Sequence, residues 1–257
     1  GQHDQSGSWK IQYVDDDNRV QLQLEDFDDR HSGWSTGTSV GLSSLEGLSG
    51  SQLRGSSTSV RFRLKRDAGT FTFDGNVGYS RGSGRFTFTP DPKFPSTLAS
   101  RGYSRPDAEQ QFQLALYDIG FSYLDELKSQ GYNRPSTDDL VSMGQHGVHY
   151  DYLRGMGQLG YHLRDTDDLV NLRDHGVTPA FITGLSQLGF GKLMADKLLE
   201  MRDHGVTPSY VSAMRDAGYR GLGADDLVEL RDHGITREYI AALADLGEGR
   251  HRGTVGD

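Results

Sequence analysis

The chain has 257 residues, a formal net charge of −9 and no cysteine. Without cysteine it has no disulfides, no thiolate metal sites and no cysteine nucleophile. No apolar run approaches the roughly 20 residues of a membrane-spanning helix, and the mean hydropathy of −0.62 is low for a compact globule but suits an array of repeats.

Alternating apolar residues predict β-strands in the first third of the chain. Trp9, Ile11 and Tyr13 alternate with polar residues, and an acidic cluster at residues 15–18 then precedes a second alternating run, as in a hairpin. Later runs alternate Phe with Thr and Arg, which is typical of an antiparallel sheet with one wet face. We therefore expect an all-β domain over residues 1–98, built as an antiparallel sandwich or a curled sheet.

A 29-residue repeat follows this domain. Four histidines mark it, at His146, His175, His204 and His233. A fixed period of this size is typical of stacked helical hairpins, in which each unit needs its neighbours to bury its apolar side. We predict a linker over residues 99–106, an α-solenoid of five hairpins over residues 107–251, and a tail over residues 252–257. The predicted fold class is α+β with two domains.

The block Leu-Arg-Asp-His-Gly-Val-Thr-Pro predicts a corner between two helices. The Gly takes the left-handed backbone that commonly ends a helix, and Thr-Pro then supplies the N-cap and the first residue of the next helix. The predicted corner residues are His146, Gly147, His175, Gly176, Pro179, His204, Gly205, Pro208, His233 and Gly234.

An Arg-Asp pair precedes three of these histidines. The pairs form a candidate interaction ridge of Arg173, Asp174, Arg202, Asp203, Arg231 and Asp232. Two interpretations stay open: a solvated, partly salt-bridged face, or a docking surface for a protein partner. Residues 107–251 contain 13 Lys and Arg against 23 Asp and Glu. Because cationic contacts to phosphate supply most nucleic-acid affinity, we expect no nucleic-acid partner.

The histidine ladder does not predict a metal centre. One His per hairpin places the imidazoles about 10 Å apart, at the usual spacing of packed helices, which is too far for them to share an ion. At the end of a helix a His can instead bond the last carbonyls. His146 and His149 are close in sequence, but Gly147 separates them at a helix end.

Three other motifs have weak chemical interpretations. Residues 37–41 match the Gly-x-Ser-x-Gly pattern of a nucleophile elbow, which needs a strand, a sharp turn and a helix; a plain strand is favoured. Residues 15–18 lack the spacing and glycine of a calcium loop, so a hairpin turn is favoured. No helix follows Gly82-Ser83-Gly84, as a phosphate cradle requires. We therefore predict no catalytic residues, no cofactor and no metal.

A distinctive pattern is formed by the predicted strands Val60–Leu64 and Gly84–Phe88, the turn Arg66–Phe71 and the repeats with Arg-Asp-His-Gly-Val-Thr-Pro. In this pattern the chain resembles the soluble extracytoplasmic region associated with membrane-bound antirepressor metallopeptidases of the β-lactam-sensor type. The resemblance spans roughly residues 9–248, but neither His-Glu-x-x-His nor Ser-x-x-Lys is present. It implies a cell-envelope setting and a non-catalytic accessory or sensing role.

These observations predict a non-catalytic extracytoplasmic protein-interaction or scaffold module without a membrane span. The partner is another protein or a second copy of the chain. The first residue is Gly1 rather than Met, which a cleaved signal peptide or the scar of an expression tag would explain; a signal peptide is favoured. The alternative function is a self-assembling extracellular filament or sheath subunit, since the ends of a solenoid are suited to head-to-tail stacking.

Overall fold

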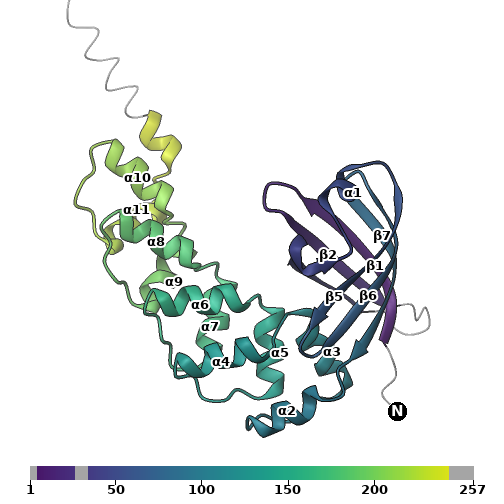
Figure 1. Ribbon diagram of the computed structural model, residues 1–257. Coiled ribbons are helices and arrows are strands. Elements are labelled where there is room, and N and C mark those ends of the chain that lie inside the picture. Colours follow the sequence, from purple (N-terminus) through teal and green to yellow (C-terminus); the bar gives the residue numbers. More distant parts are fainter. Residues whose placement is uncertain (1–4, 27–33, 243–257) are drawn as a thin grey trace, which may run out of the picture. The chain divides into compact units, whose positions relative to one another are not determined.

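The computed structural model describes residues 5–26 and 34–242. The chain divides into two compact units, Gly1–Gln145 and His146–Asp257. Figure 1 shows strands in the first unit and helices in both. The prediction of an all-β part followed by helices is confirmed. Within the described ranges, no helix combines the length and the apolar character that crossing a membrane requires.

One antiparallel sheet forms the base of the N-terminal unit, in the order β3-β2-β1-β7-β6-β5-β4. Its strands are β1 (Gln5–Val14), β2 (Arg19–Asp26), β3 (Ser35–Gly41), β4 (Leu45–Glu46), β5 (Thr58–Arg66), β6 (Gly69–Gly78) and β7 (Arg81–Pro90). Strands β3 and β4 lie at opposite edges, although only the short helix η1 (Leu42–Ser44) separates them in the chain. The sheet must therefore curl until these edges approach each other (Figure 1). Of the two predicted alternatives, the curled sheet is the one that the structure shows.

Trp9 fills the centre of the buried face of this sheet. Its ring centroid lies 5.3 Å from that of Phe62, and its Nε1 donates to the Asp74 carbonyl over 3.2 Å. Gly84 pairs with Trp9 on one side and with Gly75 on the other. A Cβ atom on Gly75 would stand 2.7 Å from the indole. Gly75 therefore leaves the space that the indole needs, and Gly84 allows the close approach of β6.

Helices complete the N-terminal unit: α1 (Gly50–Arg54), α2 (Phe94–Ser100), α3 (Ala108–Leu116), α4 (Phe121–Ser129) and α5 (Thr137–Gln145). Phe112 on α3 enters the sheet core, with its ring centroid 5.3 Å from that of Phe71. Buried Gln111 donates to the carbonyls of Ala68, over 2.7 Å, and Asp91, over 2.8 Å. Helix α5 packs in turn on α3. The predicted linker at 99–106 includes the end of α2, and the compact unit continues beyond it to Gln145 because α3 shares the core of the sheet.

The C-terminal unit contains helices of nine residues each. They are α6 (Tyr150–Gln158), α7 (Thr166–Asp174), α8 (Pro179–Gln187), α9 (Ala195–Asp203), α10 (Pro208–Asp216) and α11 (Ala224–Asp232). Successive odd-numbered helices begin 29 residues apart, as do successive even-numbered ones. Helix α8 packs against α6 and α10, and α9 packs against α11. Equivalent helices of consecutive repeats are therefore neighbours in space.

Replacing Gly84 with Ala should strongly destabilise the N-terminal unit, because the new Cβ would lie 2.0 Å from the Asp74 carbonyl oxygen. We expect the free energy of unfolding to fall by about 3 kcal/mol, the upper range for overpacking. Gly41→Ala is the matched control, since its Cβ would lie 3.8 Å from its nearest neighbour, Ser43 Oγ. That change should stay within about 0.5 kcal/mol. Chemical denaturation followed by tryptophan fluorescence measures both, and equal losses would contradict the role given to Gly84.

Candidate functional site

The repeat corners have the local geometry that the sequence predicts. His175 is the C-cap of α7, and Gly176 follows it with a φ of +74°. The Val177 N–H donates to the Leu172 carbonyl over 2.9 Å. Thr178 is the N-cap of α8, with Pro179 as the first helical residue. Four residues, 175–178, thus end one helix and begin the next: the glycine and the Val177 N–H close α7, and Thr178 caps α8.

The other corners repeat this arrangement. His204 and His233 are the C-caps of α9 and α11, and His146 directly follows α5. Gly147 has a φ of +76°, while Gly205 and Gly234 both have +74°. Pro208 is the first residue of α10. All ten predicted corner residues therefore lie at helix boundaries.

Each aspartate of the predicted ridge contacts the histidine of the preceding repeat. The Nδ1–Oδ1 distances are 2.9 Å for His146–Asp174, 2.7 Å for His175–Asp203 and 2.5 Å for His204–Asp232. An ionised carboxylate can only accept, so Nδ1 carries the hydrogen in each pair. The aspartate side chains are half-exposed. Each of these three histidines pairs with its own aspartate, so the histidines do not gather in one cluster.

Each arginine of the ridge lies over an aromatic ring of the preceding repeat. The distance from the guanidinium carbon to the ring centroid is 5.5 Å for Arg173 and Tyr152, 5.3 Å for Arg202 and Phe181, and 5.1 Å for Arg231 and Tyr210. The Nε of Arg173 donates to the Gly147 carbonyl over 3.1 Å, and that of Arg231 to the His204 carbonyl over 3.3 Å. At Arg173 and Arg231 the guanidinium therefore combines a cation–π contact with a charge-assisted hydrogen bond.

We call this set of contacts a latch. A latch joins the Arg and Asp of one repeat to the His, the Gly and the aromatic residue of the repeat before it. The three latches are Arg173 and Asp174 on His146, Gly147 and Tyr152; Arg202 and Asp203 on His175, Gly176 and Phe181; and Arg231 and Asp232 on His204, Gly205 and Tyr210. All six ridge residues therefore make contacts between consecutive repeats.

The weaker motifs occupy plain structural positions. Residues 37–41 lie in strand β3, where Ser39 Oγ accepts from Arg19 Nε over 2.8 Å. Residues 15–18 form the β1–β2 turn. Hydrogen bonds from Tyr13 and then Arg54 lower the pKa of the Asp15 carboxyl, and the Asp15–Arg54 ion pair measures 2.7 Å. Gly82-Ser83-Gly84 lies inside β7.

The described part of the chain contains no group of three or more His, Cys, Asp or Glu side chains that could hold a metal ion. His149 is the N-cap of α6, whereas His146 precedes the corner and pairs with Asp174. The two histidines therefore have different structural roles on either side of Gly147.

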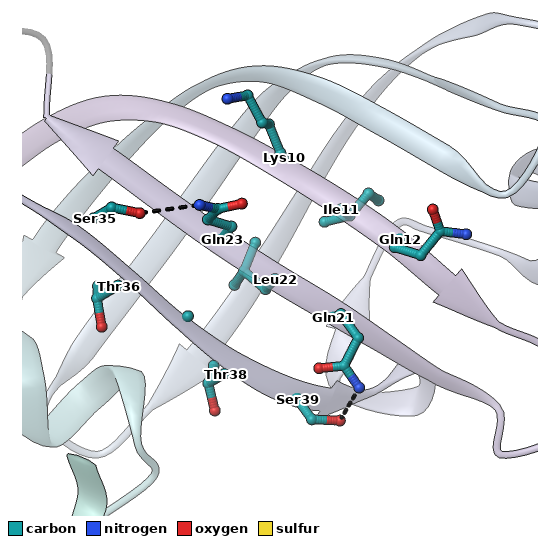
Figure 2. Close-up of a pocket in the computed structure, with 11 residues that line it drawn as sticks. Lys10, Ile11, Gln12, Gln21, Leu22, Gln23, Ser35, Thr36, Thr38 and Ser39 are labelled. Carbon is teal, nitrogen blue, oxygen red and sulfur yellow. Dashed lines mark hydrogen bonds between the residues drawn. The ribbon is translucent and has the colours of Figure 1, made fainter.

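A polar groove on the sheet was not predicted from the sequence (Figure 2). It has a volume of about 620 Å³ and lies across strands β1, β2 and β3. The lining residues are Lys10, Ile11, Gln12, Gln21, Leu22, Gln23, Ser35, Thr36, Gly37, Thr38 and Ser39. Figure 2 shows two glutamine amides bonded to serines of β3: Gln23 to Ser35 over 3.0 Å and Gln21 to Ser39 over 3.2 Å. Amides and hydroxyls thus share this surface with apolar groups, among them Ile11 and Leu22.

Strand β3, which forms one wall of the groove, is also an edge of the sheet. It pairs with β2 on one side and with no described strand on the other. Its sequence, Ser-Thr-Gly-Thr-Ser-Val-Gly, has no charge and no proline. Natural edge strands are commonly protected against pairing with other chains by charged side chains, by proline or by bulges. The sequence does show an uncharged strand at residues 35–41. It does not show that this strand lies at an edge, because alternation does not give the order of strands in a sheet.

Arg202→Ala should destabilise the C-terminal unit by about 1 kcal/mol, the scale of one cation–π contact. The control is Arg220→Ala, because Arg220 is exposed and lies in the loop after α10. Thermal unfolding of the full chain measures both, and only the first variant should lower the midpoint. In a Phe181→Leu background the effect of Arg202→Ala should shrink. An unchanged effect there would mean that the ring contributes nothing to the latch.

Comparisons with known proteins found no relative. No family model matches the chain. No curated protein and no solved structure matches it either. Function therefore has to be argued from the latches, the groove and the open edge.

Proposed function

We propose that this protein is a non-catalytic scaffold that binds other polypeptides outside the cytoplasm, and that strand β3 receives an extended segment of the partner. The observation that carries the proposal is the uncharged edge of β3 beside the polar groove. Extended peptides add to such edges through main-chain hydrogen bonds, and neighbouring side-chain pockets select among them. Extracytoplasmic location is part of the proposal and rests on the resemblance alone; cell fractionation tests it.

The dimensions suit a short peptide segment. Seven residues of β3 extend over roughly 23 Å, at about 3.3 Å per residue. Residues 35–39 all line the groove, so a strand added beside them places alternate side chains next to those of Ser35 and Ser39. The hydroxyl groups of these serines can pair with a polar segment. No charged side chain of β3 itself opposes the approach of either sign of charge.

The helical hairpins provide the scaffold in this proposal. We infer that they stack as an α-solenoid, which the packing of α8 on α6 and α10 supports. The latches tie each repeat to the one before it through a His–Asp hydrogen bond and a cation–π contact. A joint with several contacts resists bending more than apolar packing alone, because the hydrogen bonds are directional. Such an array keeps its own repeats at a defined spacing.

The alternative function is self-assembly, and the same edge gives it some support. Every copy presents an identical β3, and two such edges can pair. Antiparallel pairing of identical edges closes a two-fold dimer, whereas a filament needs two different surfaces. Light scattering across a range of concentrations should give a dimer if β3 pairs with itself. A monomer throughout would remove this alternative, and larger species would require a second contact.

Charges on β3 test the proposed function. Ser35→Glu with Ser39→Glu should block an added strand, since charged edge residues oppose pairing. Thr87→Glu with Thr89→Glu is the control, because both threonines are exposed on the central strand β7. Each protein is immobilised and used to capture partners from envelope extract. We expect the wild type and the control to retain the same polypeptide and the edge variant to retain at least about tenfold less, a difference of about 1.4 kcal/mol.

Hydrogen exchange then locates the contact. The captured polypeptide should slow amide exchange in β3 but not in β7, because only the outer side of β3 gains new hydrogen bonds. Equal capture by all three proteins, or slowed exchange confined to the helices, would contradict a β3 site. If the wild type captures nothing specific, the scaffold proposal fails.

A further inference from the structure

The three latches define what each corner binds. In every case the corner contributes a histidine Nδ1, a glycine with left-handed backbone and an aromatic ring from the following helix. The next repeat contributes an arginine and an aspartate from the last turn of its first helix. Where the latch is made, the ring is buried: the exposed fractions are 7% for Tyr152, 6% for Phe181 and 2% for Tyr210.

The corner at His233 repeats these elements, but no described residue supplies the arginine and aspartate. Gly234 has the same φ of +74° as Gly205, and Tyr239 stands 29 residues after Tyr210. Tyr239 is 49% exposed, in contrast to its buried equivalents. His233 Nδ1 contacts the Glu229 carbonyl of its own helix over 2.8 Å. The corner is therefore preformed, and its histidine has taken a local substitute partner.

The space beside each corner glycine gives an independent measure of whether a guanidinium lies there. A Cβ atom would lie 3.2 Å from a guanidinium atom at Gly147, 3.1 Å at Gly176 and 2.8 Å at Gly205. At Gly234 no described residue lies within 4 Å of that position. The arginine site of the fourth corner is thus open toward every part of the chain that the structure describes.

Apolar residues around this corner are also uncovered. Leu230 and Ile235 are half-buried. Their equivalents one repeat earlier, Met201 and Val206, are fully buried, each with an exposed fraction of 0%. The last described repeat therefore leaves more of this apolar face exposed than the repeat before it.

We propose that the corner of His233, Gly234 and Tyr239 is a binding site for a helix of a partner protein whose last turn carries Arg followed by Asp. The three occupied latches argue for this occupant, because the same corner chemistry binds the same dipeptide each time. The guanidinium lies over Tyr239 and donates to the corner carbonyl. The carboxylate accepts from His233 Nδ1 once the ring leaves the Glu229 carbonyl. The apolar face of the partner helix covers Leu230 and Ile235.

A peptide of residues 193–205, held helical by a side-chain staple, is the probe. It carries Arg202 and Asp203 in the last turn of α9. A staple is needed because isolated helices of this length are marginal in water. Titration into the full chain, followed by NMR of the His233 ring, should show saturable binding. A peptide with Arg202→Ala should bind about tenfold more weakly, since it loses the cation–π contact and a charge-assisted hydrogen bond.

Two variants of the full chain test the location. Tyr239→Ala should weaken binding about tenfold. Tyr219→Ala is the matched control, with 48% of its side chain exposed in the same unit but outside the corner, and should leave binding unchanged. Neither ring is buried, so both variants should fold.

Several results would overturn the proposal. One is that the stapled peptide shows no binding, and another is that the peptide with Arg202→Ala binds as tightly as the original. Equal effects of Tyr239→Ala and Tyr219→Ala on binding would also contradict it. Binding seen only after removal of residues 243–257 would assign the corner to the chain's own C-terminal segment. Self-association lost in Tyr239→Ala would assign it to a second copy. None of these outcomes depends on β3, so the corner and the edge strand can fail separately.

Discussion

A helix of nine residues cannot stand alone in water, because its few hydrogen bonds do not repay the cost of nucleation. All helices from α3 to α11 have this length, so each depends on its neighbours for stability. The chain meets the constraint with corners that fix the direction of the next helix. The glycine at +74° ends one helix, and Thr-Pro begins the next without a flexible linker. The latch then ties the corner to the following repeat.

The same constraint explains where the compact units divide. The repeat nearest the sheet has no Arg-Asp pair, and α3 instead buries Phe112 among the sheet phenylalanines. Helix α5 packs on α3, so these helices belong to the N-terminal unit. The latches begin only at His146. The boundary between units therefore follows a change in how a short helix is stabilised, from an apolar core to polar joints.

The sequence predicts the local parts of this structure well, because they depend on residues close together in the chain. Caps, corner glycines and the 29-residue spacing of helix starts all follow from patterns of a few residues. The Asp-to-His contacts were not predicted, because the partners stand 28 residues apart and the period does not say which side chains face each other. Strand order is likewise non-local: alternation indicates β3, but not that it lies at an edge. Nothing in the sequence placed Phe112 in the sheet core, since its apolar spacing suits a helix stripe equally well.

The two proposed surfaces follow from one physical principle. Inner strands of the sheet pair on both sides, and three corners of the C-terminal unit are latched. Beside β3 no further described strand pairs on the outer side, and near Gly234 no described arginine takes the place that it takes at the other three corners. Binding at a group with fixed geometry loses less conformational entropy than binding at a flexible exposed side chain, so more of the contact energy appears as binding free energy. Preorganisation of this sort distinguishes these two places from the rest of an acidic, well-solvated surface.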